Sequence, residues 1–84
     1  MSSTAYLLTL ACPNRPGIVA RVTTELFDHG GNILEAHQFD DVQAGRFFTR
    51  IAFDLADDTR FEAFREAFGP IADHYAMDWS LRPL

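Results

Sequence analysis

The residues best placed for chemistry lie in a short loop between an apolar run and an amphipathic segment. The loop consists of Pro13, Asn14, Arg15, Pro16 and Gly17. Pro16 presets a backbone angle suited to a tight turn or a first helical turn, and Gly17 allows a ligand to approach the backbone closely. Free amides at a helix amino terminus attract anions. We therefore expect this loop to hold a small ligand that carries a carboxylate or another anionic group.

The composition limits the functions open to the chain. Its 84 residues, 48% of them hydrophobic, predict one domain over residues 1–84 with a modest core that a partner subunit or second domain completes. A net charge of −5, with no lysine, argues against binding to nucleic acid or anionic lipid. No apolar run approaches the roughly 20 residues of a membrane span, and no secretory signal is visible. These features favour the cytoplasm.

Hydrophobic periodicity predicts six elements that must position the loop. We expect strands at 5–12, 32–39, 46–55 and 77–81, and helices at 17–29 and 61–75, with a hairpin loop at 40–45. The order is a split βαβ repeat, which predicts an α+β fold: a four-stranded antiparallel sheet with two helices on one face. Phe48 falls on the other face, which is too apolar to stay wholly wet and favours self-association or docking.

The pattern within these elements gives finer expectations. In the first helix, Val19, Val22 and Leu26 form the apolar stripe, widened by Ile18 and Phe27, and Gly30-Gly31 ends the helix.

The second helix carries apolar residues at spacings of three and four. These are Phe61, Phe64, Phe68, Ile71 and Tyr75. Pro70 should kink this helix or split off its last turn because it lacks a backbone N–H. In the second strand, Ile33 and Leu34 compete for the inward position, so its register stays open.

With these elements in place, the sequence resembles the ACT domain family, small regulatory modules attached to enzymes of amino-acid and one-carbon metabolism. The resemblance rests first on residues 13–19 and on Asn32-Ile33. The stretches 45–50, 61–68 and 77–79 add a likeness to the amino-terminal domains of the formyltetrahydrofolate deformylase family. It implies a dimeric, ferredoxin-like domain that senses an amino acid, with glycine and methionine as the expected effectors.

In that family, a larger formyltransferase-like domain hydrolyses 10-formyltetrahydrofolate to tetrahydrofolate and formate. The resemblance therefore implies that Leu84 lies near a truncation point, or that the chain is a free-standing relative. We expect no catalytic residue, metal or cofactor within the chain itself.

The resemblance also implies which residues bind the effector between two subunits. One subunit would supply the loop and helix start, and the other the beginning of its second strand. The residues are Asn14, Arg15, Pro16, Gly17, Ile18 and Val19 of one chain, and Asn32, Ile33 and Leu34 of its partner. Amides near Gly17 would take the carboxylate, and the side chains of Asn14 and Asn32 would hold the ammonium group. Asn14 stands where the family usually has aspartate, which weakens its hold on the ammonium group but keeps a helix-capping oxygen.

Other functions fit the residues less well. Cys12 could act as a nucleophile, but no spacing places His29 or His37 beside it. His29, His37 and His74 are scattered without the spacing of a metal site.

Two binding or catalytic alternatives share the element order. A small acylphosphatase-like enzyme would use Arg15 in the loop. RNA binding of the RRM type would use aromatic residues of the third strand, but Phe47 and Phe48 are adjacent and so point to opposite faces.

Overall fold

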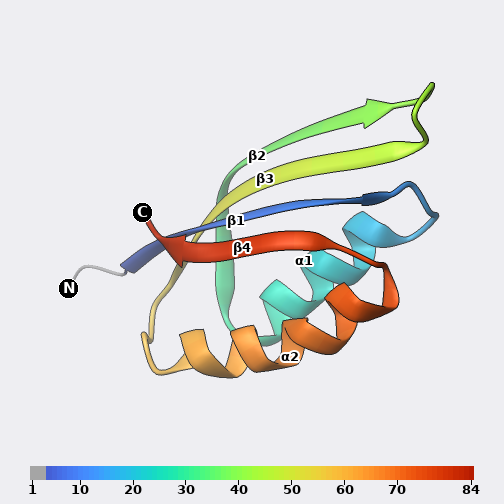
Figure 1. Ribbon diagram of the computed structural model, residues 1–84. Coiled ribbons are helices and arrows are strands. Elements are labelled where there is room, and N and C mark those ends of the chain that lie inside the picture. The colour runs from blue at the N-terminus through green and yellow to red at the C-terminus, as the bar shows by residue number, and fades with distance from the viewer. Residues whose placement is uncertain (1–3) are drawn as a thin grey trace.

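Six secondary-structure elements follow one another in the predicted order. The computed structural model describes residues 4–84. Its elements are β1 (Thr4–Pro13), α1 (Ile18–Asp28), β2 (Gly31–Asp41), β3 (Arg46–Leu55), α2 (Arg60–His74) and β4 (Asp78–Pro83), as Figure 1 shows. The predicted βαββαβ order is confirmed, and the bounds differ from the expected ones only by the usual uncertainty of element ends.

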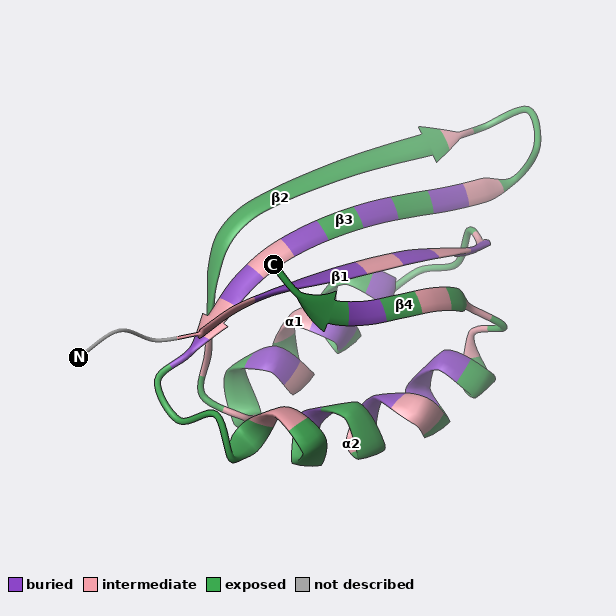
Figure 2. Ribbon diagram, turned by 60° about the vertical axis from the view of Figure 1, so that its left-hand side comes forward, coloured by how far each residue is buried: buried purple, intermediate pink, exposed green. Residues whose placement is uncertain are grey.

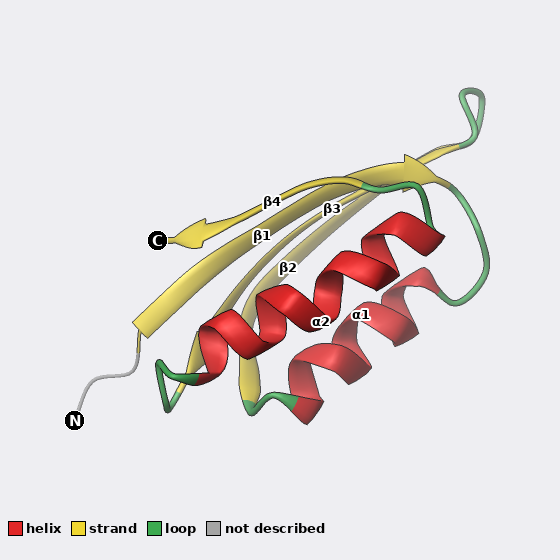
Figure 3. Cartoon of the chain, turned by 60° about the horizontal axis from the view of Figure 1, so that its bottom comes forward, coloured by secondary structure: helices red, strands yellow, loops and turns green. Residues whose placement is uncertain are grey.

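The four strands form one antiparallel sheet in the order β2-β3-β1-β4. Both helices pack against the same face of this sheet, and the opposite face carries neither of them (Figures 1 and 3). This is the α+β, ferredoxin-like arrangement predicted from the sequence. The strand order makes β2 and β4 the two edges.

The two faces of the sheet differ sharply in burial along β3. Phe48 and Arg50 point to the open face and are exposed, which gives the alternation along β3 in Figure 2. The residues of β3 buried under the helices are Phe47, Thr49, Ile51, Phe53 and Leu55. β1 lies in the middle of the sheet, as its two apolar faces predict, and even Leu7 on its open face is 2% exposed.

Aromatic rings form the centre of the core between the helices and the sheet. Phe64 lies 5.6 Å from Phe53 and 5.6 Å from Phe68, measured between ring centroids. The ring of Phe68 in turn meets Trp79 of β4 edge-on at 4.9 Å. Offset and edge-on rings bury large apolar areas in a defined geometry, so this cluster joins α2 to both the centre and one edge of the sheet.

The apolar stripe of α1 differs from the predicted one at two residues. Ile18, Val22 and Leu26 are buried, whereas Val19 and Phe27 are exposed. The stripe therefore follows spacings of four, and the assignment of Val19 and Phe27 to it is wrong. Adjacent apolar residues such as Ile18 and Val19 allow two phases about 100° apart, and contact with the sheet selects one of them.

The glycine pair at the end of α1 has the predicted function. Gly30 adopts a φ of 77°, in the left-handed region that ends many helices. Gly31 has a different reason to be glycine, because a Cβ there would lie 2.9 Å from the carbonyl oxygen of Leu26. The chain can therefore turn tightly from α1 into β2.

α2 passes through Pro70 without a break. The helix continues to His74, so the predicted separate last turn does not form. Pro70 removes one backbone donor, but Ile71 and Ala72 beyond it are buried against the core. Burial of that last turn outweighs the loss of one hydrogen bond.

A β-bulge settles the register of β2. Ile33 pairs with Phe53 and Glu35 pairs with Ala52, so Leu34 is the extra residue between them. Ile33 therefore lies on the helix side of the sheet, the inward position for which the two residues compete. Both remain open to solvent, Ile33 at 40% and Leu34 at 53% exposure, because β2 is an edge strand.

Candidate functional site

The loop between β1 and α1 presents an uncapped helix start. Gly17 occupies the N-cap position with φ 85° and ψ 0°, and no side chain of residues 4–84 caps the helix there. Its carbonyl oxygen accepts the first intrahelical hydrogen bond, from the Arg21 amide at 2.9 Å. The amides of the first turn therefore face outward from the helix end, where the helix dipole favours an anion.

Asn14 ties this loop to the hairpin between β2 and β3. Its side-chain Nδ2 donates to Oδ1 of Asp40 at 2.9 Å, and its backbone amide donates to the Gly45 carbonyl at 2.9 Å. The expected capping role of Asn14 is wrong, because its side chain reaches across to β2 and not to the start of α1. The contact instead brings the carboxylate of Asp40 beside the loop, a residue that sequence reasoning missed.

The remaining loop residues divide by exposure. Arg15 and Pro16 are exposed, and Val19 is exposed on the first turn of α1. Ile18 is buried in the core, so only its backbone amide is available to a ligand. The predicted residues of the loop and helix start therefore offer backbone donors and exposed side chains together at one end of the sheet.

The second half of the predicted site lies at the other end of α1. Asn32, Ile33 and Leu34 follow the carboxyl end of α1, whose 11 residues span about 16 Å. All three are exposed. The two halves are therefore far apart within one chain, and a site that combines them requires a second chain.

A small cavity of about 340 Å³ lies where the beginning of α1 meets the end of α2. It is lined by Arg21 of α1 and by Pro70, Ile71, His74 and Tyr75. The Tyr75 hydroxyl lies 4.0 Å from the position that a Cβ on Gly17 would take. The sequence assigns Tyr75 to a buried stripe, so its place beside the loop is visible only in the fold.

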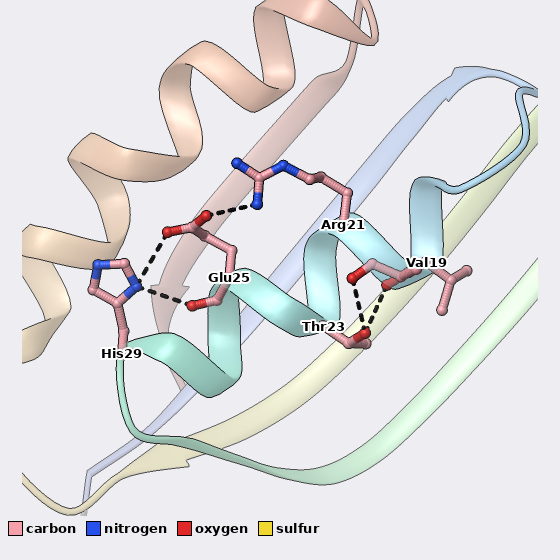
Figure 4. A network of polar contacts seen from close by, with 6 residues as sticks. Val19, Arg21, Thr23, Glu25 and His29 are labelled. Atoms are coloured by element: carbon pink, nitrogen blue, oxygen red, sulfur yellow. Dashed lines mark hydrogen bonds and ion pairs between the residues drawn. The ribbon is translucent and has the colours of Figure 1, made fainter.

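A polar network along α1 explains two of its charged residues (Figure 4). Nη1 of Arg21 donates to the Glu25 carboxylate at 2.8 Å, and Nδ1 of His29 lies 3.4 Å from the other carboxylate oxygen. The same His29 nitrogen lies 2.9 Å from the Glu25 backbone oxygen, and its ring meets Phe64 edge-on. These contacts give His29 a structural role at the end of α1.

Within residues 4–84, the structure favours neither Cys12 as a nucleophile nor a metal site. Cys12 is fully buried, and burial raises the pKa of its thiol, which disfavours the reactive thiolate. Residues 4–84 contain no group of three His, Cys, Asp or Glu side chains that could hold a metal ion. Over the same residues, no helix is long and apolar enough to cross a membrane.

The open face of the sheet carries a concave surface that encloses about 540 Å³, more than the cavity beside Tyr75. Its lining includes Phe39 and Phe48, whose ring centroids lie 6.2 Å apart. Phe47, by contrast, is buried under the helices, as the opposed directions of Phe47 and Phe48 predict. The sequence identifies Phe48 as an exposed apolar residue of this face, but Phe39 joins it only through strand pairing.

Comparison with known proteins identifies the class. Residues 6–69 match the ACT domain family, whose fold has the strand and helix order found here, and the chain belongs to that family. Its relatives include formyltetrahydrofolate deformylases. The Bacillus subtilis deformylase is 43% identical over 76 residues, a match that covers 88% of this chain and 25% of that protein.

Solved structures agree with this relationship. The deformylase from Pseudomonas syringae pv. tomato is 40% identical with a TM-score of 0.85, covering 99% of this chain and 28% of that one. The deformylase from Burkholderia mallei is 37% identical with a TM-score of 0.86, covering 93% and 27%. The chain thus spans about a quarter of the length of the curated relative from Bacillus subtilis and of these solved chains.

Proposed function

We propose that this chain is the amino-acid-sensing ACT domain of a formyltetrahydrofolate deformylase. The observation that carries the proposal is the likeness to deformylases over 88% of the chain, at 43% identity. The rest of such a protein would hydrolyse 10-formyltetrahydrofolate with water to tetrahydrofolate and formate, within one-carbon and purine metabolism. In this proposal, the ACT domain binds an effector and leaves the chemistry to the other domain.

The start of α1 would bind the carboxylate of the effector. The outward amides of Ile18, Val19 and Ala20 have no acceptor within the helix, because intrahelical bonding begins with Arg21. Gly17 has no side chain to block the approach of a carboxylate oxygen. The positive end of the helix dipole adds to this attraction.

Asp40 would contribute the negative charge that an ammonium group requires. The family usually places aspartate where this chain has Asn14, and the Asn14 amide donates to the Asp40 carboxylate. A carboxylate keeps further acceptor capacity after one such bond. An α-ammonium group beside the loop could therefore be held by Asp40 together with Asn32 of the partner subunit.

Pairing of two β2 edges would assemble the complete site. Asp40 marks the end of β2 and touches the loop through Asn14, whereas Asn32 marks its beginning. Antiparallel pairing about a two-fold axis places the beginning of one β2 beside the end of the other. The loop of one chain would thus meet the partner's Asn32, within a continuous sheet across both chains.

The exposure of β2 supports this assembly. Ile33 and Leu34 expose apolar side chains on an unpaired edge, an arrangement that favours pairing with another chain. Effector binding would then stabilise one dimer geometry and bias the attached catalytic domain. This requires the effector to bind two states of the dimer with different affinities.

An NMR titration of the 84-residue chain tests the proposal. Its dimeric state is first established by analytical ultracentrifugation, and glycine, methionine, serine and inorganic phosphate are then added in turn. We expect saturable amide shifts confined to residues 14–19, 32–34 and Asp40 with one amino acid. A dimer that shows no shift with any amino acid would overturn the sensor and leave a module that serves assembly alone. A monomer would overturn the site between two subunits. Shifts with phosphate alone would favour a small anion-binding enzyme.

Two substitutions and a control sharpen this test. Asp40→Asn keeps an acceptor for Asn14 but removes the charge, and should weaken amino-acid binding by about tenfold or more. Asn32→Ala should weaken it by several-fold. Glu62→Gln changes an exposed residue in the first turn of α2, which belongs to neither half of the site, and should leave binding unchanged. Equal effects at Asp40 and Glu62 would show that overall charge, and not the site, governs binding.

A further inference from the structure

We infer that the open face of the sheet carries a second binding site, for a planar aromatic compound with one carboxylate. The site is separate from the proposed effector site, which lies at the loop and at the beginning of β2. The second site occupies the concave surface on the open face, whose volume of about 540 Å³ is typical of small-molecule sites.

Strand pairing arranges the lining in two parallel rows across the sheet. The first row joins four polar residues, from β2 to β4: His37, Arg50, Thr9 and Ser80. The second row lies two residues further along the strands: Phe39, Phe48, Ala11 and Asp78. All eight line the concave surface. One row therefore offers hydrogen-bonding groups, and the other begins with two aromatic rings.

The second row favours a flat ligand. Phe39 and Phe48 are 63% and 40% exposed, and their rings lie at 37° to each other. Beside them Ala11 contributes only a methyl group, so a planar ring can lie over the sheet against the two phenyl edges. Thr9 and Ser80 keep their hydroxyls close to the sheet by bonding to each other at 2.6 Å.

Arg50 gives the site its preference for an anion. Its directly paired neighbours are His37 on one side and Thr9 on the other, and neither is a carboxylate. His37 itself lies 3.1 Å from Glu35, which accounts for that nearby carboxylate. Arginine binds planar carboxylates through two parallel hydrogen bonds. A single negative charge on the ligand therefore suits this position.

Asp78 defines the opposite end of the site. It lies on β4, two strands away from Arg50 on β3 and two residues further along the strands, so their Cα atoms are about 12 Å apart. A ligand of two fused rings spans this separation, with a carboxylate at Arg50 and an N–H donor at Asp78. The order of charges thus sets the orientation as well as the class of ligand.

Shape and charge disfavour the other occupants of such a face. A second copy of the chain would bring an equally concave face, and two concave surfaces leave a gap between them. A single-stranded nucleic acid would meet a chain of net charge −5 with one arginine at the centre of the groove. A small convex ligand fits both properties.

The probe is 6-amino-2-naphthoate, which carries a carboxylate and an amine at opposite ends of a flat ring system. Titration followed by amide NMR should give saturable shifts at Thr9, Ala11, Phe48, Arg50 and Ser80, with a Kd of about 1 mM for a compound of this size. The same residues should respond at least several-fold more weakly to 2-naphthylamine, which lacks the carboxylate.

Two arginines of the same face provide the matched pair of variants. Arg50→Gln removes the charge inside the groove and should weaken binding of the probe about tenfold. Arg82→Gln removes a charge from β4 outside the lining and should change it less than about twofold. Both side chains are exposed, so both variants should keep the native amide spectrum.

Three results would overturn the inference. One is the absence of saturable shifts at these residues up to about 5 mM probe. Another is movement of the Thr9, Ala11 and Ser80 amides on dilution of the protein alone, which would show that a second copy covers the face, because these residues lie on β1 and β4, away from the proposed β2 pairing. The third is stronger binding of oligouridylate than of the probe. None of these results depends on residues 14–19 or 32–34, so failure here is distinct from failure of the amino-acid sensor.

Discussion

Replacement of Gly17 by alanine should destabilise the chain through backbone conformation alone. Gly17 has φ 85° and ψ 0° at the N-cap of α1, a conformation that a residue with a Cβ rarely adopts. The added methyl group would meet only the Tyr75 hydroxyl, at 4.0 Å, which is an ordinary contact. Steric overlap with the rest of the fold therefore contributes little.

The size of the effect follows from two opposing free energies. A left-handed conformation costs an L-residue with a Cβ roughly 1–2 kcal/mol. Alanine also restricts the unfolded chain more than glycine does, which returns roughly 0.4–1 kcal/mol. The net loss in the free energy of unfolding for Gly17→Ala is about 1 kcal/mol. Gly17→Asn should cost only a few tenths, because asparagine tolerates this conformation better.

Urea unfolding followed by far-ultraviolet circular dichroism and by Trp79 fluorescence measures both variants. At a slope of about 1 kcal/mol per molar urea, Gly17→Ala should lower the midpoint by about 1 M. All samples are compared at one protein concentration, since a dimer makes the midpoint depend on it. An unchanged midpoint for Gly17→Ala would refute the strain argument. An equal loss for asparagine would show that the side chain's volume, and not φ, is responsible.

Three further predictions concern the core and the titrating groups. Phe64→Ala should lower the free energy of unfolding by about 3–5 kcal/mol because the ring is fully buried, whereas Phe27→Ala, at a residue 78% exposed, should change it by less than about 0.5 kcal/mol in the same urea assay. Cys12 is buried and its thiol pKa is raised, so iodoacetamide should alkylate it at least about a hundredfold faster in the urea-unfolded chain than in the folded chain. Mass spectrometry measures both rates, and equal rates would place the thiol at the surface. Hydrogen bonds from the Thr59 hydroxyl and amide lower the pKa of Asp57. The stabilising contribution of the ionised Asp57 is therefore present above the ordinary carboxyl pKa and is lost as pH falls through the lowered value. Thr59→Val should raise the pKa of Asp57 in an NMR titration, and an unchanged pKa would assign the shift to other groups.

Hydrophobic periodicity predicts the buried face of an element well where only one face is apolar. The spacings of α2 and the alternation of β3 each define one buried face, and Phe64 and Phe53 lie on those faces as expected. The start of α1 is different, because Ile18 and Val19 are both apolar and either could face the sheet. Only contact with the strands selects Ile18.

The candidate site shows the same division. Pro16 and Gly17 mark the loop in the sequence because their backbone preferences are local. The contact between Asn14 and Asp40 joins residues 26 positions apart, and it exists because β1 and β2 both pair with β3. A helix cap is the nearest local use for an asparagine there, which explains why that prediction fails.

The sequence by itself determined the order of the elements, the left-handed glycine that ends α1, and membership of the ACT family, because these depend on residues close together along the chain. The tertiary structure alone decided that β2 is an edge strand, that a bulge sets Leu34 apart, and that Phe39 stands beside Phe48. These features depend on which strands pair and in what register. Such pairing reflects burial summed over the whole sheet, and no single segment carries it.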